Sequence, residues 1–254
     1  FIGLELAATL SGKAAAVTVV EPAREPLERV LGAEIGAALR GVHERRGVVL
    51  RCGRQVVDLA PGEDGQTPLL VSLDDGTQFA ADYVIESIGS QPNVEWLAGN
   101  GLDLSDGILC DRHMRCEGRP NVVAAGDVAR FPNDFVDDTP RRFEHWCVPA
   151  QTGKRAAESL AAHLLGQPLS EGRFDPLPSF WSDQYDHRIQ GFGVPSLADR
   201  REIVSGSVAD LAEAERGLAV ACYRGPRLIG MVGIGLAPAE NAALRQAVVA
   251  GTAE

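Results

Sequence analysis

The first part of the chain reads as apolar segments separated by short polar breaks. Residues 4–10 predict a short helix that Gly12 ends. Residues 14–20 form a continuous apolar run that ends at Glu21, which is typical of a parallel strand covered by helices on both faces. Residues 31–46 carry apolar side chains at helical spacing and predict an amphipathic helix. This alternation of helix and strand indicates an α/β domain.

Further short strands are expected after this helix. Asp74-Asp75-Gly76 predicts a hairpin turn between two of them, and the last one runs into Gly89. The predicted strands are residues 48–51, 55–59, 69–73, 77–80 and 83–88.

A second unit combines two strands with a long helix. Residues 108–111 and 121–125 predict the strands. Residues 149–165 predict the helix, because Pro149 suits its first turn and Gly166 ends it. Its apolar face consists of Ala150, Ala157, Leu160, Ala161, Leu164 and Leu165.

The third unit has a different pattern, with a Pro-rich linker at residues 176–178 before it. Strands are expected at residues 188–193, 201–205, 218–223 and 227–234, and a final helix at residues 239–249. The pattern therefore predicts α/β units followed by a small α+β C-terminal domain.

Composition and charge narrow the class of protein. The chain has 254 residues, of which 45% are hydrophobic and 23% charged, as in globular proteins. Its net charge of −11 disfavours nucleic acid and anionic lipid as partners. No apolar run reaches the ~18 residues of a membrane-spanning helix. The chain opens without Met inside a predicted helix, so we expect a piece of a longer protein.

The cysteines and histidines point to a reducing compartment and to no metal site. The five cysteines are scattered and form no C-x-x-C pair, which is typical of reduced thiols in a cytoplasmic protein. The five histidines show no pairing at ligand spacing.

Gly3 and Glu21 have the spacing of half a dinucleotide-binding motif. Such a motif places glycines at a pyrophosphate and an acidic residue on the adenosine ribose after the next strand. A carboxylate at Glu21 would repel a 2′-phosphate, which favours NAD(H), whereas Arg24 and Arg29 would weaken that preference. The alternative is a packing glycine, a strand-end carboxylate and solvated arginines.

The chain resembles the FAD-dependent pyridine nucleotide reductases, in the ferredoxin and rubredoxin reductase branch. The segments that carry the resemblance occur in family order over essentially the whole chain. They are residues 1–5 (FIGLE), 17–21 (VTVVE), 83–92 (YVIESIGSQP), 121–127 (NVVAAGD), 144–153 (EHWCVPAQTG), 180–184 (FWSDQ) and 189–190 (IQ).

This resemblance implies roles for single residues. Gly3, Glu5, Glu21 and Gly89 would meet NADH, with Arg29 beside them. Gly126 and Asp127 would bind the ribityl chain of FAD, and Glu144, His145, Trp146 and Trp181 would lie at the flavin. For each side chain a packing or surface role is the alternative. No general base is expected, since the cofactor supplies the chemistry.

The implied fold class is α/β, with Rossmann-like dinucleotide-binding units and a small α+β C-terminal domain. The implied domains are an NAD(H)-binding domain at residues 1–90, the C-terminal half of an FAD-binding domain at 91–170, and a C-terminal reductase domain at 171–254. Relatives carry further residues upstream, including the first FAD glycine motif. Glu86 departs from the family by placing a carboxylate in a strand, so it needs either a partner or an exposed position.

The implied activity is hydride transfer from NADH to FAD, followed by single-electron transfer to a small iron–sulfur ferredoxin or rubredoxin. Seven arginines are candidates for a basic docking patch: Arg141, Arg142, Arg188, Arg200, Arg201, Arg224 and Arg227. Two alternatives stay open. One is a catalytically incompetent nucleotide-binding or interaction module, and the other is a different flavin-dependent NADH oxidoreductase. The oligomeric state does not follow from the sequence.

Overall fold

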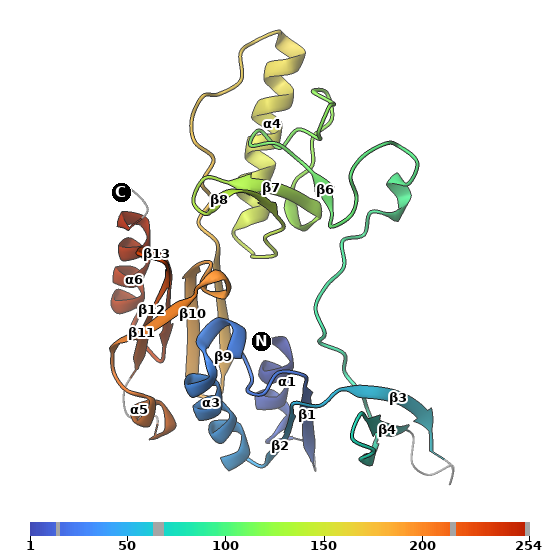
Figure 1. Cartoon of the computed structure of the whole chain (residues 1–254), viewed down its shortest axis with the longest axis vertical. Helices are drawn as coiled ribbons and strands as arrows, with labels where there is room; N and C mark the ends of the chain where they lie inside the picture. Colours follow the sequence, from blue (N-terminus) through green and yellow to red (C-terminus); the bar gives the residue numbers. More distant parts are fainter. Residues whose placement is uncertain (14–15, 63–68, 214–216, 252–254) are drawn as a thin grey trace.

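The fold was analysed in a computed structural model that describes residues 1–13, 16–62, 69–213 and 217–251. Its N-terminal unit pairs β1 (Val17–Glu21) with β2 (Val48–Cys52) in parallel, with Val17 opposite Val48 (Figure 1). Helix α1 (Ile2–Leu10) precedes β1, and α3 (Ala33–Arg45) precedes β2. The predicted helix–strand–helix–strand order is confirmed, except that residues 14–15 lie outside the described residues and Ala16 precedes the strand.

The predicted helix at residues 31–46 is two helices in the structure. The short α2 (Glu28–Leu31) ends at Gly32, and α3 starts directly after it. Gly32 has a φ of +88°, which a right-handed helix does not accommodate. The apolar spacing continues across the break, which is why the pattern alone predicts one helix.

An antiparallel hairpin sheet follows, formed by β3 (Val56–Pro61), β4 (Leu69–Leu73) and β5 (Gln78–Ala81). The predicted turn at Asp74-Asp75-Gly76 lies between β4 and β5. The pattern located all three strands to within two residues.

The predicted strand at residues 83–88 is wrong. This segment is irregular, and Tyr83 and Ile88 are 89% and 88% exposed. A strand forms only where its backbone groups meet a partner, and no strand in the described part of the chain pairs with this one. Glu86 is exposed, so its carboxylate does not need the buried partner that was the other possibility.

The second unit holds β6 (Ile108–Leu109), β7 (Ala129–Asn133), β8 (Asp137–Arg141) and α4 (Val148–Leu165), with two 3-10 turns, η1 (Glu95–Leu97) and η2 (Gly126–Val128). Strand β7 pairs with β6 in parallel and with β8 antiparallel. The predicted strand at residues 121–125 is wrong, because only Val123 forms a bridge, to Arg115. Strands β7 and β8 were not predicted.

The buried side of α4 is not its apolar side. Its buried residues are Val148, Thr152, Arg155, Ala156 and Ser159, whereas Leu164 and Leu165 are 74% and 68% exposed. The predicted apolar face is therefore present in the sequence but uncovered in this chain. The polar residues on the buried side have hydrogen-bond partners. The Ser159 hydroxyl donates to the carbonyl of Arg155 within the helix (2.9 Å), and the guanidinium of Arg155 donates to the carbonyls of Arg112 (3.2 Å) and Gly172 (2.7 Å).

The C-terminal domain is a five-stranded antiparallel sheet in the order β11-β12-β13-β10-β9. Its strands are β9 (Ser179–Gln184), β10 (His187–Gly193), β11 (Arg200–Ser205), β12 (Leu218–Arg224) and β13 (Arg227–Ile234). The turn η3 (Pro195–Leu197), helix α5 (Val208–Glu213) and helix α6 (Pro238–Ala250) complete it. The sequence predicts four of these strands and α6, but neither β9 nor α5.

Both faces of this sheet are buried, each against a different unit. One cluster joins the first unit to the sheet through Leu31, Ile35, Leu39, Ile189, Val220, Val232 and Ile234. The other joins the second unit to the opposite face through Phe131, Phe143, Val148, Phe192, Ala221 and Met231. Within the described ranges, no helix combines the length and apolar character needed to cross a bilayer.

Two glycines of α3 provide a test of how the first unit is packed. A Cβ on the buried Gly36 would lie 2.6 Å from the carbonyl oxygen of Pro26 and 2.9 Å from the Cβ of Glu25. We therefore expect Gly36→Ala to lower the free energy of unfolding by about 1–3 kcal/mol in urea denaturation.

The matched control is Gly41→Ala in the same helix, where the new Cβ would meet only the guanidinium end of Arg45, at 3.1 Å. This change should be neutral or stabilising by up to about 1 kcal/mol, since alanine favours the helix. Equal effects of the two substitutions would contradict the packing of α3 against residues 25–26.

Candidate functional site

A cavity of about 270 Å³ lies beside the Gly-Asp segment of the second unit. Asp127 is an exposed residue of η2 and faces this cavity, and Gly126 before it has a φ of +75°. Ala125 is extended, so the chain turns sharply at the glycine. The other lining residues are Ser90, Gln91, Pro92, Asn93, Val128, Arg142 and Glu144.

The Gly-Asp turn is anchored to the first turns of α4. The N–H of Gly126 donates to the hydroxyl oxygen of the buried Thr152 (3.0 Å), and that hydroxyl donates to the carbonyl of Val148 (3.0 Å). This relay fixes the backbone next to Asp127. Sequence reasoning missed Thr152, although it lies within the Ala150-to-Gly153 segment of the resemblance.

Glu144 and Arg142 tie the two sides of the cavity together. The hydroxyl of Ser90 donates to the carboxylate of Glu144, which also forms an ion pair with Arg142. Arg142 further bonds Asp106 (2.6 Å) and donates to the carbonyl of Asp127 (3.4 Å). The segment that follows Gly89 is therefore held against the Gly-Asp turn. Neither Ser90 nor the ion pair follows from the sequence.

His145 and its aromatic neighbours form the next part of the site. The ring of His145 stands edge-on to Phe180 (5.9 Å), and Phe180 contacts Phe1 (4.9 Å). Burial lowers the pKa of His145, against the opposing effect of the backbone of Ser179 and of the charge on Glu144. The imidazole is therefore neutral at neutral pH. Its Nδ1 atom is buried without a hydrogen-bond partner among the described residues.

The start of α1 meets strand β9 at this same place. The carboxylate of Glu5 accepts the N–H of Asp183 (3.2 Å). A Cβ built on Gly3 would lie 3.6 Å from the Cβ of Ser87, so the irregular segment 83–88 passes close to α1. Trp181 on β9 and Trp146 before α4 are 46% and 85% exposed. Neither indole belongs to the core of the described residues.

Gly89 and Glu21 lie at two further positions of the expected cofactor site. Gly89 has a φ of +103°, and nothing lies within 4 Å of the position that a Cβ would take. Glu21 ends β1, and its carboxylate accepts the N–H of Ala23 (2.9 Å).

Comparison with known proteins identifies the family. Residues 1–153 match the family described as pyridine nucleotide-disulphide oxidoreductase, and residues 179–253 match the reductase C-terminal domain. The chain belongs to the pyridine nucleotide-disulphide oxidoreductase family. The two matched regions reach into all three units of the fold, and residues 154–178 lie between them.

The family members most informative here are ferredoxin reductases. Putidaredoxin reductase of Pseudomonas putida is 36% identical over 209 residues, which are 82% of this chain and 47% of that protein. Rhodocoxin reductase of Rhodococcus erythropolis is 32% identical over 234 residues, 91% of this chain and 50% of that protein. The chain spans about half the length of these relatives. The resemblance to the ferredoxin reductase branch is confirmed.

Solved structures of this family agree with the fold. The covalent putidaredoxin reductase–putidaredoxin complex matches with a TM-score of 0.80 at 32% identity, covering 97% of this chain and 55% of that one. A ferredoxin reductase of Rhodopseudomonas palustris matches with a TM-score of 0.77 at 32% identity, covering 92% and 54%. The predicted α/β class with a C-terminal α+β domain is confirmed. The domain boundaries themselves stay predictions.

The predicted basic docking patch is not a set of free charges. Four of its arginines form ion pairs with Asp137, Asp106, Glu144 or Asp183, and Arg200 pairs with Glu202. Arg201 and Arg227 donate to backbone carbonyls instead. Three of them, Arg201, Arg224 and Arg227, bond to a different unit of the chain. Arg29 is exposed, and its carbonyl accepts a bond from Arg201 (2.7 Å).

No metal site accompanies this arrangement in the part of the chain that the structure describes, where no three His, Cys, Asp or Glu side chains gather as ligands. The chemistry available at the site is hydrogen bonding, charge and aromatic contact.

The Thr152 relay leads to a testable expectation. Thr152→Val removes the acceptor of the Gly126 N–H, so the free energy of unfolding should fall by about 1–2 kcal/mol. Thr152→Ser retains the hydroxyl and should lose less than half of that. Thr139→Val, at an exposed threonine of β8, is the surface control. Urea denaturation measures all three, and equal losses for valine and serine at position 152 would contradict the relay.

Proposed function

We propose that the chain is the C-terminal part of an NADH-dependent ferredoxin reductase that passes a hydride from NADH to FAD and single electrons to a small iron–sulfur protein. The observation that carries this proposal is the convergence of three units on one site. Helix α1 and strand β9 meet there through Glu5 and Phe180. Phe180 also contacts His145, which follows Glu144 at the cavity beside the Gly126-Asp127 turn. The similarity to two ferredoxin reductases over most of this chain supports it.

The residues present fit FAD. The carboxylate of Asp127 is exposed toward a cavity, and the buried Nδ1 of His145 has a hydrogen-bonding capacity that no described residue uses. Gly126 and Asp127 would hold the ribityl chain, while Glu144, His145, Trp146 and Trp181 would lie along the ring. FAD, when bound, supplies hydride acceptance and one-electron release.

The chain's own residues would orient and enclose the cofactors. Neutral His145 adds no charge next to the flavin, and the indoles of Trp146 and Trp181 offer flat apolar surface that excludes water. The hydrogen bond from Ser90 to Glu144 would hold the segment after Gly89, on the NADH side, next to the Gly-Asp turn. On the NADH side, Gly3 and Gly89 would allow close backbone approach, and Glu5 would meet the nicotinamide amide.

Glu21 supports NADH rather than NADPH as the reductant. Its carboxylate stands at the carboxyl end of a parallel strand, where the ribose of a dinucleotide binds in such folds. A 2′-phosphate there would be repelled, and Arg24 and Arg29, which follow Glu21 in the sequence, would moderate this repulsion. The five free thiols support a reducing location such as the cytoplasm.

Two uncovered apolar surfaces support a longer protein. The leucines at the end of α4 and the residues Tyr83, Ile85 and Ile88 are exposed in this chain. Apolar groups of this size are normally buried against another part of the same protein.

The alternative function is a nucleotide-binding or interaction module without catalysis. For the electron acceptor, an iron–sulfur protein of the rubredoxin type is the alternative to a ferredoxin.

The first test concerns flavin binding. Asp127→Ala in the 254-residue chain should weaken FAD binding by about ten-fold or more, since a charge-assisted hydrogen bond is lost. Quenching of tryptophan fluorescence by added FAD measures the Kd. Asp58→Ala, at an exposed carboxylate on β3, is the control and should leave the Kd unchanged. An unchanged Kd for Asp127→Ala would remove the Gly-Asp turn from the flavin site.

The second test concerns the nicotinamide cofactor. Glu21→Gln should weaken NADH binding by roughly ten-fold and narrow the preference over NADPH, because the carboxylate both binds the ribose and repels the phosphate. Equilibrium titration with each nucleotide measures both effects. Glu34→Gln, at an exposed carboxylate in the first turn of α3, is the control. Loss of NADH affinity without a change in the preference would argue against a ribose contact.

The two functions differ in one measurement. The purified chain, supplied with FAD, should reduce ferricyanide with NADH if it is catalytically competent. A colourless chain that binds NADH but reduces no ferricyanide would favour the binding module for this chain.

A further inference from the structure

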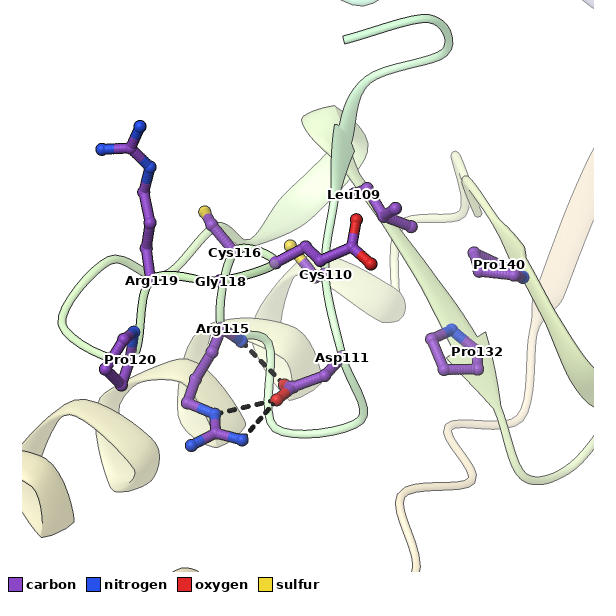
Figure 2. A pocket seen from close by; sticks show the side chains of 11 residues that line it. Leu109, Cys110, Asp111, Arg115, Cys116, Gly118, Arg119, Pro120, Pro132 and Pro140 are labelled. Atoms are coloured by element: carbon purple, nitrogen blue, oxygen red, sulfur yellow. Dashed lines mark hydrogen bonds and ion pairs between the residues drawn. The ribbon is translucent and has the colours of Figure 1, made fainter. Parts of the chain in front are cut away.

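A second cavity lies away from the proposed cofactor site and is lined by two cysteines. It has a volume of about 400 Å³, and Cys110 and Cys116 both line it (Figure 2). Asp111 and Arg115 form an ion pair (2.7 Å) at the turn between the two cysteines. Neither cysteine is among the residues that would meet a cofactor in the function proposed above.

Cys110 and Cys116 are directly opposite each other on two antiparallel segments. They form a β-bridge, flanked by hydrogen bonds from the Asp111 N–H to the carbonyl of Arg115 (2.9 Å) and from the Glu117 N–H to the carbonyl of Leu109 (3.2 Å). This pattern makes the cysteines a non-hydrogen-bonded pair, in which the Cα atoms are about 4.5 Å apart. Disulfides span Cα separations of about 4.4–6.8 Å, so the backbone already has a suitable spacing.

The two side chains also share one environment. Directly opposite residues of an antiparallel pair lie on the same face, and Figure 2 shows both thiols on the wall of the cavity. Each thiol affects the ionisation of the other, which places the sulfur atoms close together. Both are free thiols in the structure.

We infer that Cys110 and Cys116 form a reversible disulfide when a peroxide enters this cavity. The thiolate of Cys116 attacks one peroxide oxygen, the O–O bond breaks, and a sulfenic acid and water result. The thiol of Cys110 then attacks the sulfenic sulfur, the S–O bond breaks, and the S–S bond forms with release of a second water. The two thiols give up two electrons and two protons, and the peroxide takes up both.

Charge and burial set which cysteine reacts first and how fast. Burial raises the pKa of Cys110 to about 12. Burial also raises the pKa of Cys116, but the positive charge of Arg119 opposes it. Cys116 is therefore the better nucleophile of the two. Since both thiols are largely protonated at neutral pH, the rate of oxidation should rise about ten-fold from pH 7 to pH 8.

The pair is coupled to the Gly-Asp turn through the backbone. The N–H of Cys116 donates to the carbonyl of Val122 (2.9 Å), and the N–H of Ala124 donates to the carbonyl of Met114 (3.0 Å). Two residues later the chain reaches Gly126. The disulfide would therefore lie on a segment that is hydrogen-bonded to residues 122–124, directly before the Gly-Asp turn.

Mass spectrometry of the folded chain tests this inference. The chain is treated with hydrogen peroxide, free thiols are alkylated, and the product is digested with trypsin without reductant. Because trypsin cleaves after Arg112 and Arg115, the disulfide would join peptides 55–112 and 116–130. The joined mass should be lower than the sum by two hydrogens, and dithiothreitol should separate the peptides.

Cys222→Ser is the matched control, since Cys222 is a buried thiol of the other hydrophobic cluster. This variant should form the linked peptides at the wild-type rate, and Cys116→Ser should form none. Three results would each overturn the inference: both thiols staying open to alkylation after peroxide, sulfinic acid without linkage, or a linkage that forms only in urea. A linkage of either cysteine to a different one would do the same.

Discussion

The structure depends on one constraint, which is that the C-terminal sheet has to be buried on both faces. Along β13, Ile229 and Met231 enter the cluster shared with the second unit, while Val232 and Ile234 enter the cluster shared with α3. Strand side chains alternate between faces, so each central strand contributes to two cores. The first and second units cannot be separated from this sheet without exposing one of these cores. The relative position of the units follows from this packing.

The candidate site lies where the three units meet around the edge strand β9 of that sheet. On β9, Trp181 is 46% exposed, and the neighbouring Phe180 contacts both Phe1 and His145. Polar ties complete the assembly, such as the bond between the buried His43 and Gln184 (3.0 Å), which joins α3 to β9. Three of the arginines that the sequence suggests as a docking patch, Arg201, Arg224 and Arg227, also bond across units. Arg141 and Arg224, from different units, both pair with Asp137.

Sequence patterns predict elements well where the local pattern and the tertiary burial agree. Strands β12 and β13 are apolar on both faces and were located to within a residue, because both faces are buried. The same kind of pattern at residues 83–88 predicted a strand that does not form in this chain. An apolar run indicates that a segment is buried in the complete fold. A strand also requires a neighbouring strand that pairs with its backbone N–H and C=O groups. The apolar side of α4 shows the same limit, since its leucines lie in solvent while Thr152 and Arg155 are buried.

The sequence by itself determined the family, the order of the three units and the residues that meet the cofactors in the proposed function. Motif residues such as Gly126, Asp127 and Glu21 can be recognised in the sequence because their residue type and their spacing within the motif are local properties. They do not depend on how distant segments pack. Only the tertiary structure decided how those residues are supported. The relay from Gly126 through Thr152, the bond from Ser90 to Glu144 and the opposition of Cys110 and Cys116 join positions whose partners are chosen by packing. Contacts of this kind leave no periodic signal along the chain, because each depends on the distance between elements rather than on the spacing within one.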